Sequence, residues 1–104
     1  MDVTPEELWS QIQAGRAPVI LDVRSGPEFR SGHVQGAVHL PFWSALLRAW
    51  RLIARRDDPV VVYCRHGPRA SLAAEALRLR GFRNVRLLEG HMAQWRRQGL
   101  PLEE

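Results

Sequence analysis

Four short apolar runs set the pattern of this chain. The runs VILDV and VVVYC are rich in β-branched residues and show no alternation of apolar and polar positions. Continuous runs of this kind are typical of strands that are buried on both faces. We therefore predict four strands, at 19–23 (VILDV), 37–41 (AVHLP), 60–64 (VVVYC) and 84–90 (NVRLLEG).

The segments between these runs carry apolar residues at helical spacing. The first helix is predicted to begin after Thr4 as N-cap, with Pro5 at its first position, and to end at Gly15. Other helices are predicted at 43–56, at 70–80 (built on Leu72, Ala73, Ala76 and Leu77) and at 91–98 (with Trp95 facing the core), and at most one helical turn at 27–30. Alternating strands and helices predict an α/β fold in which helices cover both faces of a parallel sheet.

Length and charge narrow the class of protein. A chain of 104 residues corresponds to one domain spanning 1–104, and 45% apolar residues is ordinary globular usage. No apolar run approaches the roughly 20 residues that span a bilayer, and the acidic N-terminus shows no secretory signal, so we expect a cytoplasmic protein. All 15 basic residues are arginine and they are scattered along the chain, which favours biased codon usage over a nucleic-acid partner.

Cys64 is the single cysteine of the chain. It therefore has no partner for an intrachain disulfide and cannot belong to a zinc site with several cysteines. The 4 histidines include no pair at His-x3-His spacing, so we expect no metal site. A lone cysteine is usually a small buried hydrophobe, and its neighbours decide between that role and a nucleophile.

The neighbours of Cys64 favour an exposed nucleophile. Cys64 ends the central predicted strand, and the loop Arg65-His66-Gly67-Pro68-Arg69 leads directly into a predicted helix. Ligand sites in parallel α/β sheets gather beyond the carboxyl ends of the strands, where helix N-termini present free N–H groups to anions. Gly67 permits the backbone angles of a tight anion-binding loop. Beside Arg65 and Arg69, the thiol is expected to exist largely as thiolate near neutral pH.

Three separated motifs of the chain resemble those of a known family. LDVRSGPEFRSGHVQGAVHLP at 21–41, VVVYCRHGPRASLAAEAL at 60–77 and NVRLLEGHMAQW at 84–95 look like a rhodanese domain, a thiosulfate or persulfide sulfurtransferase. The resemblance covers most of the chain. It implies a parallel five-stranded sheet, a catalytic cysteine at Cys64 that carries a persulfide, and a substrate cradle at Arg65, His66, Gly67, Pro68 and Arg69.

The length of the loop separates related chemistries. Rhodaneses commonly have four residues between the cysteine and the closing arginine, as here between Cys64 and Arg69, whereas related dual-specificity phosphatases have five. The resemblance therefore favours sulfur transfer over a phosphatase or arsenate reductase. A non-catalytic binding or regulatory module is the other alternative, although inactive relatives commonly lose the cysteine. The chain departs from the family at Ala70, where a serine is frequent, and at Gly90-His91, where two glycines are usual. Thiosulfate-specialised relatives often carry two cations just after the cysteine, and here the second is His66.

The resemblance also implies the partners and the supporting residues. A small anionic sulfur donor loads Cys64, and a thiol or protein cysteine accepts the sulfur, with no cofactor required. Asp22 and Arg24 are expected to support the fold as an ion pair, and Glu28 to brace it or face solvent. His33 is expected to bond the backbone, His39 to be satisfied in its strand, and His66 either to tune the thiolate or to point to solvent, while no role is assigned to His91.

The basic segment 43–56 keeps three interpretations. In the first interpretation, its tryptophans and leucines, from Trp43 onward, pack on the sheet while the arginines stay in solvent. Alternatively, the helix lies on a membrane surface, which suits arginine opposite tryptophan and leucine. In the third interpretation it docks an acidic sulfur-carrier protein.

Overall fold

A central sheet of parallel strands organises the chain. The structure, a computed structural model, describes residues 2–44, 48 and 55–104. Within them the strands β1 (Val19–Asp22), β2 (Val38–His39), β3 (Val60–Tyr63) and β4 (Val85–Leu87) lie in the order β2-β1-β3-β4, and every pairing is parallel. Every residue of β3 is buried, as the unbroken apolar run predicts.

The five-stranded sheet that the family resemblance implies is wrong, because the described sheet has four strands. The fifth position, beside β4, is held by an isolated bridge between Val3 and Leu88. Val3 donates its N–H to the carbonyl of Leu87 at 2.9 Å and accepts from the N–H of Glu89 at 2.8 Å. The helix that begins at Pro5 leaves no room for a longer strand, since its N-cap is already Thr4.

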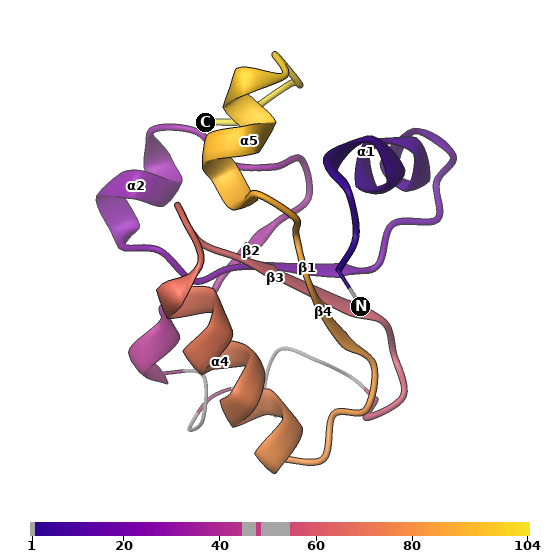
Figure 1. The fold of residues 1–104 in the computed structure, drawn as a ribbon, viewed down its shortest axis with the longest axis vertical. Helices are drawn as coiled ribbons and strands as arrows, with labels where there is room; N and C mark the ends of the chain where they lie inside the picture. The colour runs from indigo at the N-terminus through magenta and orange to yellow at the C-terminus, as the bar shows by residue number, and fades with distance from the viewer. Residues whose placement is uncertain (1, 45–47, 49–54) are drawn as a thin grey trace.

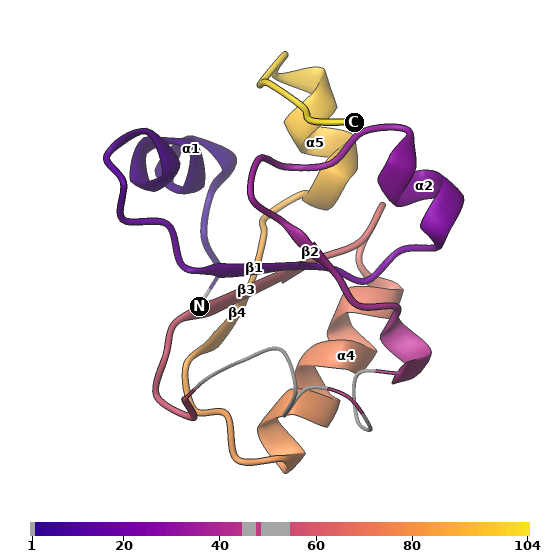
Figure 2. The ribbon, with the colours of Figure 1, turned by 180° about the vertical axis from the view of Figure 1, so that it is seen from behind.

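Helices cover both faces of the sheet. In Figures 1 and 2, α4 (Pro68–Leu79) lies on one side, while α1 (Pro5–Gln13), α2 (Gly26–Arg30) and α5 (His91–Arg97) lie on the other. Side chains alternate between two cores along each central strand: Val60 and Val62 pack toward α4, whereas Val61 and Tyr63 pack toward α1 and α5. The α/β class and its helices on both faces are therefore confirmed.

Local signals place the first helix well. Thr4 and Glu7 form the reciprocal hydrogen bonds of a capping box, at 3.1 and 2.9 Å, and Pro5 opens the first turn. The predicted single turn near 27–30 is α2, which has its own capping box between Ser25 and Glu28.

The helix after Cys64 differs from its prediction in two ways. It begins at Pro68 instead of Ala70, so the last part of the predicted loop forms its first turn. Leu72 is 61% exposed, so its predicted place in the core is wrong. The buried face follows the spacing i, i+3, i+4, i+7 through alanines and one leucine, at Ala70, Ala73, Ala74 and Leu77.

Most of the predicted helix 43–56 lies outside the described residues. Trp43 belongs to a short 3₁₀ helix, η1 (Phe42–Ser44), and is 68% exposed, so it does not pack on the sheet as predicted. Ser44, which donates through both its N–H and its hydroxyl to the carbonyl of Pro41, is the buried residue of this turn. Its inward position directs Trp43 to solvent.

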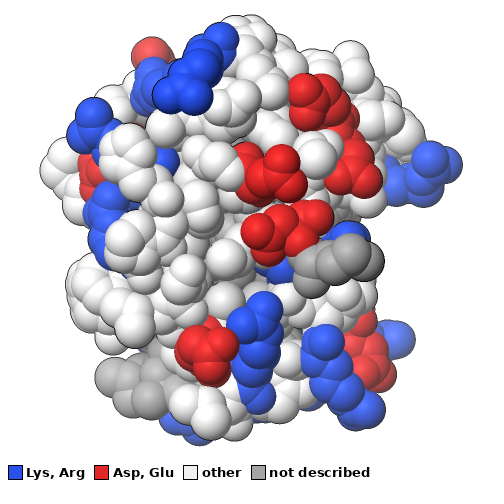
Figure 3. Space-filling model, viewed as in Figure 1, with Lys and Arg blue, Asp and Glu red and all other residues white. Residues whose placement is uncertain are grey.

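Charge is mixed on the surface that Figure 3 shows, where arginine side chains are interspersed with aspartate and glutamate. Among the described residues, no helix is long and apolar enough to cross a membrane.

Candidate active site

Cys64 lies where the central strand β3 passes into α4. The backbone N–H of Gly67 donates to Cys64 Sγ at 3.0 Å, so the loop closes around the sulfur. Gly67 has φ +134°, in the region that favours glycine, and it is the N-cap of α4. The N-terminal end of a 12-residue helix therefore faces the same loop as the thiol. The expected exposure of the cysteine is wrong, because Cys64 as a whole is 1% exposed and the loop covers its sulfur.

The first turn of α5 binds the backbone of the loop through two hydrogen bonds. The N–H of Met92 donates to the carbonyl of Cys64 at 3.0 Å, and the N–H of Ala93 donates to the carbonyl of Arg65 at 3.2 Å. These bonds use donors that a helix start leaves free, and they satisfy carbonyls at the end of β3. The position of the cysteine is consequently fixed by two helices, α4 and α5.

His91 is a residue of this site to which the sequence assigned no role. Its Nδ1 accepts the N–H of Cys64 at 3.2 Å, so the neutral ring carries its proton on Nε2. His91 has φ +55°, the one positive φ outside glycine among the described residues, and burial lowers the pKa of its imidazole. A Cβ on Gly67 would lie 3.3 Å from His91 Nε2, which is a second reason for glycine there. The signal in the sequence was the histidine at a position where the family usually has glycine.

Asp22 and Arg24 form the predicted ion pair at the end of β1. Arg24 Nη2 lies 2.7 Å from Asp22 Oδ2, Arg24 Nε lies 3.0 Å from Oδ1, and the two side chains are 3% and 0% exposed. Arg24 Nη2 also donates to the carbonyl of Gly32 at 2.7 Å. The pair thus joins the strand end to the turn after α2.

Arg69 is held by a carboxylate instead of standing free in the loop. Its guanidinium bonds Glu28 through two contacts, at 2.7 and 3.1 Å, and so ties α4 to α2. The hydrogen bonds from Arg69 lower the pKa of Glu28 to about 2. Glu28 therefore braces the site, with Arg69 as its partner.

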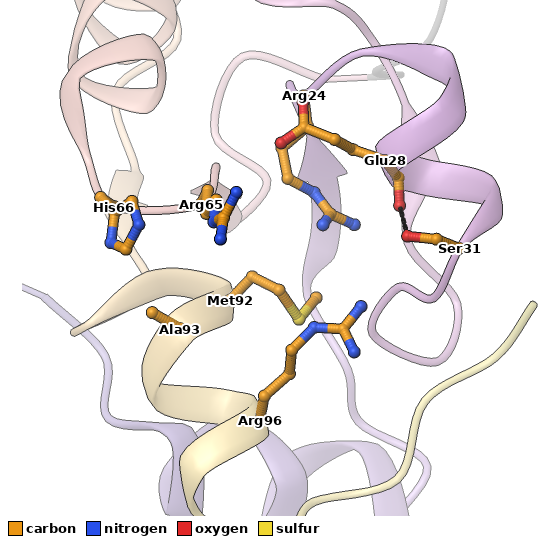
Figure 4. A pocket seen from close by; sticks show the side chains of 8 residues that line it. All are labelled: Arg24, Glu28, Ser31, Arg65, His66, Met92, Ala93 and Arg96. Carbon is orange, nitrogen blue, oxygen red and sulfur yellow. Dashed lines mark hydrogen bonds between the residues drawn. The ribbon is translucent and has the colours of Figure 1, made fainter.

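A pocket opens beside the cysteine loop. It has a volume of about 290 Å³, and Figure 4 shows its lining side chains converging from the loop, from α5 and from the α2 side. Arg65 and His66, the two residues after Cys64, are exposed and line it, whereas Gly67, Pro68 and Arg69 are absent from the lining. The lining residues are Arg24, Glu28, Ser31, Arg65, His66, Met92, Ala93 and Arg96.

The remaining histidines are structural. His33 Nδ1 bonds the carbonyl of Phe29 at 2.8 Å, as predicted, and His39 Nε2 bonds the carbonyl of Arg24 at 2.7 Å. Both rings stack on Phe29, with centroids 3.8 and 4.9 Å away. Within the described part of the chain, no group of three or more histidine, cysteine, aspartate or glutamate side chains could hold a metal ion.

Comparison with known proteins matches this arrangement to a family. The model of the Rhodanese-like domain matches residues 4–98. Thiosulfate sulfurtransferase GlpE of Actinobacillus succinogenes is 37% identical over 102 residues, which are 98% of this chain and 89% of that protein.

Solved structures agree with the sequence comparison. A crystal structure of the Alr3790 protein from Anabaena has a TM-score of 0.88 at 31% identity, over 97% of this chain and 80% of that chain. Thiosulfate sulfurtransferase from Pseudomonas aeruginosa also has a TM-score of 0.88, at 32% identity over 96% of this chain and 19% of that chain. With a cysteine loop at the end of β3 and a family match over nearly its whole length, the chain belongs to the rhodanese-like domain family.

Proposed function

We propose that this protein is a sulfurtransferase that moves a sulfane sulfur from thiosulfate or a persulfide donor to a thiophilic acceptor through a persulfide on Cys64. The observation that carries the proposal is the hydrogen bond of 3.0 Å from the Gly67 N–H to Cys64 Sγ. It joins the sulfur to a loop at the N-terminal end of α4, where negative charge is favourable. The activity of the GlpE relatives supports the same chemistry.

The donor step is a displacement at sulfur. The Cys64 thiolate attacks the outer sulfur of thiosulfate, the new Sγ–S bond forms, and the S–S bond of thiosulfate breaks. The bonding pair leaves with sulfite, and Cys64 keeps the transferred sulfur as a persulfide anion. Charge balances without an external oxidant or reductant, and no cofactor is needed. The N–H groups of the loop stabilise the terminal sulfur anion.

The other residues of the loop and its neighbours bind the donor, shape the loop or support it. Arg65 and His66 are exposed in the pocket, where Arg65 attracts and orients the anionic donor. Gly67 and Pro68 shape the cradle as the N-cap and first residue of α4. Arg69, bonded to Glu28, holds the loop in place, while Asp22 and Arg24 support the strand end next to it.

The acceptor step must use a molecule from outside the chain. Cys64 is the single cysteine and the chain has no lysine, so nothing within it can resolve the persulfide as a disulfide or intercept it with an amine. A small thiol, a protein cysteine or cyanide therefore takes the sulfur in one step. We propose that this exchange occurs in the cytoplasm.

Sulfite release tests the assignment of the nucleophile. The Cys64→Ser variant is expected to fold as the parent does and to release no sulfite from thiosulfate in the presence of cyanide. Ser71→Ala, which alters a hydroxyl on α4 and leaves the loop intact, is the matched control and should keep the activity. Sulfite release by Cys64→Ser would refute the nucleophile, and a parent protein that releases none would favour a non-catalytic module.

A further inference from the structure

Two cations in the pocket have no acidic partner within the described residues. Arg24 is neutralised by Asp22, and Glu28 by Arg69. In residues 2–44, 48 and 55–104, neither Arg65 nor Arg96 has an ion-pair or hydrogen-bond partner for its guanidinium. The pocket therefore presents two uncompensated positive charges from two different elements, the loop after β3 and the last turn of α5.

Arg96 lies one helical turn farther along α5 than the residue that contacts the cysteine loop. Met92, four residues earlier on the same face of α5, is bonded to the carbonyl of Cys64, so Arg96 starts about 6 Å farther along the helix axis. In Figure 4 its guanidinium turns toward Arg24 and Ser31, across the pocket from His66. A Cβ on Gly32 would lie 3.1 Å from Arg96 Nη2, so the guanidinium packs over this glycine.

The surface between the two cations is partly apolar. Met92 and Ala93 form it, and methionine adapts its shape to irregular ligands. The volume of about 290 Å³ is several times larger than an inorganic anion of a few atoms, since a water molecule occupies about 30 Å³ of liquid. Thiosulfate would therefore fill only part of this volume.

We infer that the pocket is built for the persulfide of a small carboxylate-bearing thiol, with Arg96 binding a carboxylate remote from the reacting sulfur. This inference rests on the proposed function and names the donor class for it. The sulfane sulfur lies at Cys64, the carbon skeleton crosses Met92 and Ala93, and the carboxylate meets Arg96. The Cys64 thiolate attacks the outer sulfur, the Sγ–S bond forms, and the donor leaves as its thiolate with the bonding pair.

Loading of Cys64 by different donors tests the role of Arg96. The probes are glutathione persulfide, which carries carboxylates, and the persulfide of 2-mercaptoethanol, which carries none. The rate of sulfur gain is measured by intact mass at several donor concentrations, without acceptor. For Arg96→Gln, the preference for glutathione persulfide over the neutral persulfide, as a ratio of second-order loading constants, is expected to fall about tenfold, the effect of one charge-assisted hydrogen bond in a partly open pocket.

Arg97→Gln is the matched control, because Arg97 is the next residue of α5, bonds Gln94 and does not line the pocket. It should keep the preference of the parent protein. An unchanged preference in Arg96→Gln, or an equal fall in Arg97→Gln, overturns the assignment. If the parent protein gains no sulfur from any of thiosulfate and the two persulfides, the proposed function itself fails, which is a different outcome from loss of donor preference.

Discussion

The buried ion pair between Asp22 and Arg24 makes a quantitative prediction about stability. Asp22→Asn keeps the shape of the side chain and removes its charge. Arg24 then retains a guanidinium that is 3% exposed, opposite an amide that presents one acceptor instead of two. The carboxylate otherwise accepts from the Arg24 N–H at 2.9 Å, from Nε at 3.0 Å and from Nη2 at 2.7 Å.

The expected cost is large because a charge loses its partner inside the protein. Breaking a buried pair by removing one member costs about 3–5 kcal/mol. Domains of this size have about 5–15 kcal/mol of stability, so the variant loses a large share of it. At roughly 4–8 °C for each kcal/mol, the Tm should fall by about 12 °C or more.

Urea unfolding followed by far-ultraviolet circular dichroism measures this cost. The control is Glu28→Gln, which breaks the pair with Arg69, where the side chains are 29% and 31% exposed. Pairs open to solvent contribute up to about 1 kcal/mol, so the control should be much milder. If Asp22→Asn costs no more than Glu28→Gln, the reasoning from burial is refuted.

Other consequences can be measured on the same protein. Glu28 has a folded pKa of about 2, below its ordinary 4.5. Its carboxylate therefore stabilises the folded protein by about 1 kcal/mol above pH 5, and this contribution is lost as pH falls toward 2. Urea unfolding between pH 6 and 3 should show this loss in the parent and not in Glu28→Gln. His91→Ala and His91→Gly both lose the acceptor for the Cys64 N–H, but only the glycine variant relieves the strain of the φ of +55°. The alanine variant should therefore be about 1 kcal/mol less stable than the glycine variant in urea unfolding, and equal stabilities would contradict the strain. Arg65→Ala should lower loading by thiosulfate more than loading by the neutral persulfide, as followed by intact mass, and equal losses would mean that Arg65 acts on the thiolate instead of the donor.

Local signals made the framework of the fold predictable. Thr4, Pro5 and Glu7 are close in sequence, and they place the start of α1 by bonds that need no other part of the chain. The unbroken apolar run of β3 likewise predicts, from neighbouring residues alone, a strand that is buried on both faces. The loop of Cys64 could be placed because a strand end and a helix start bracket it.

Contacts between residues that lie far apart in the sequence could not be predicted from local patterns. Arg69 was expected to face the donor, but Glu28, 41 positions earlier, holds its guanidinium. His91 bonds the backbone of Cys64 from 27 positions away, and Arg96 joins the pocket through the docking of α5. Leu72 shows the opposite error, because its apolar side chain was assigned to the core although the packed face of α4 follows the alanines.

Sulfur loading of Cys64 is the step on which the proposed function depends. The protein is exposed to thiosulfate, desalted and weighed as an intact chain, before and after addition of a small thiol or cyanide. We expect a gain of one sulfur atom that persists through desalting, disappears in one step when the acceptor is added, and is absent in Cys64→Ser. No gain of mass, or loss of the added sulfur during desalting without an acceptor, would contradict a persulfide carrier at Cys64.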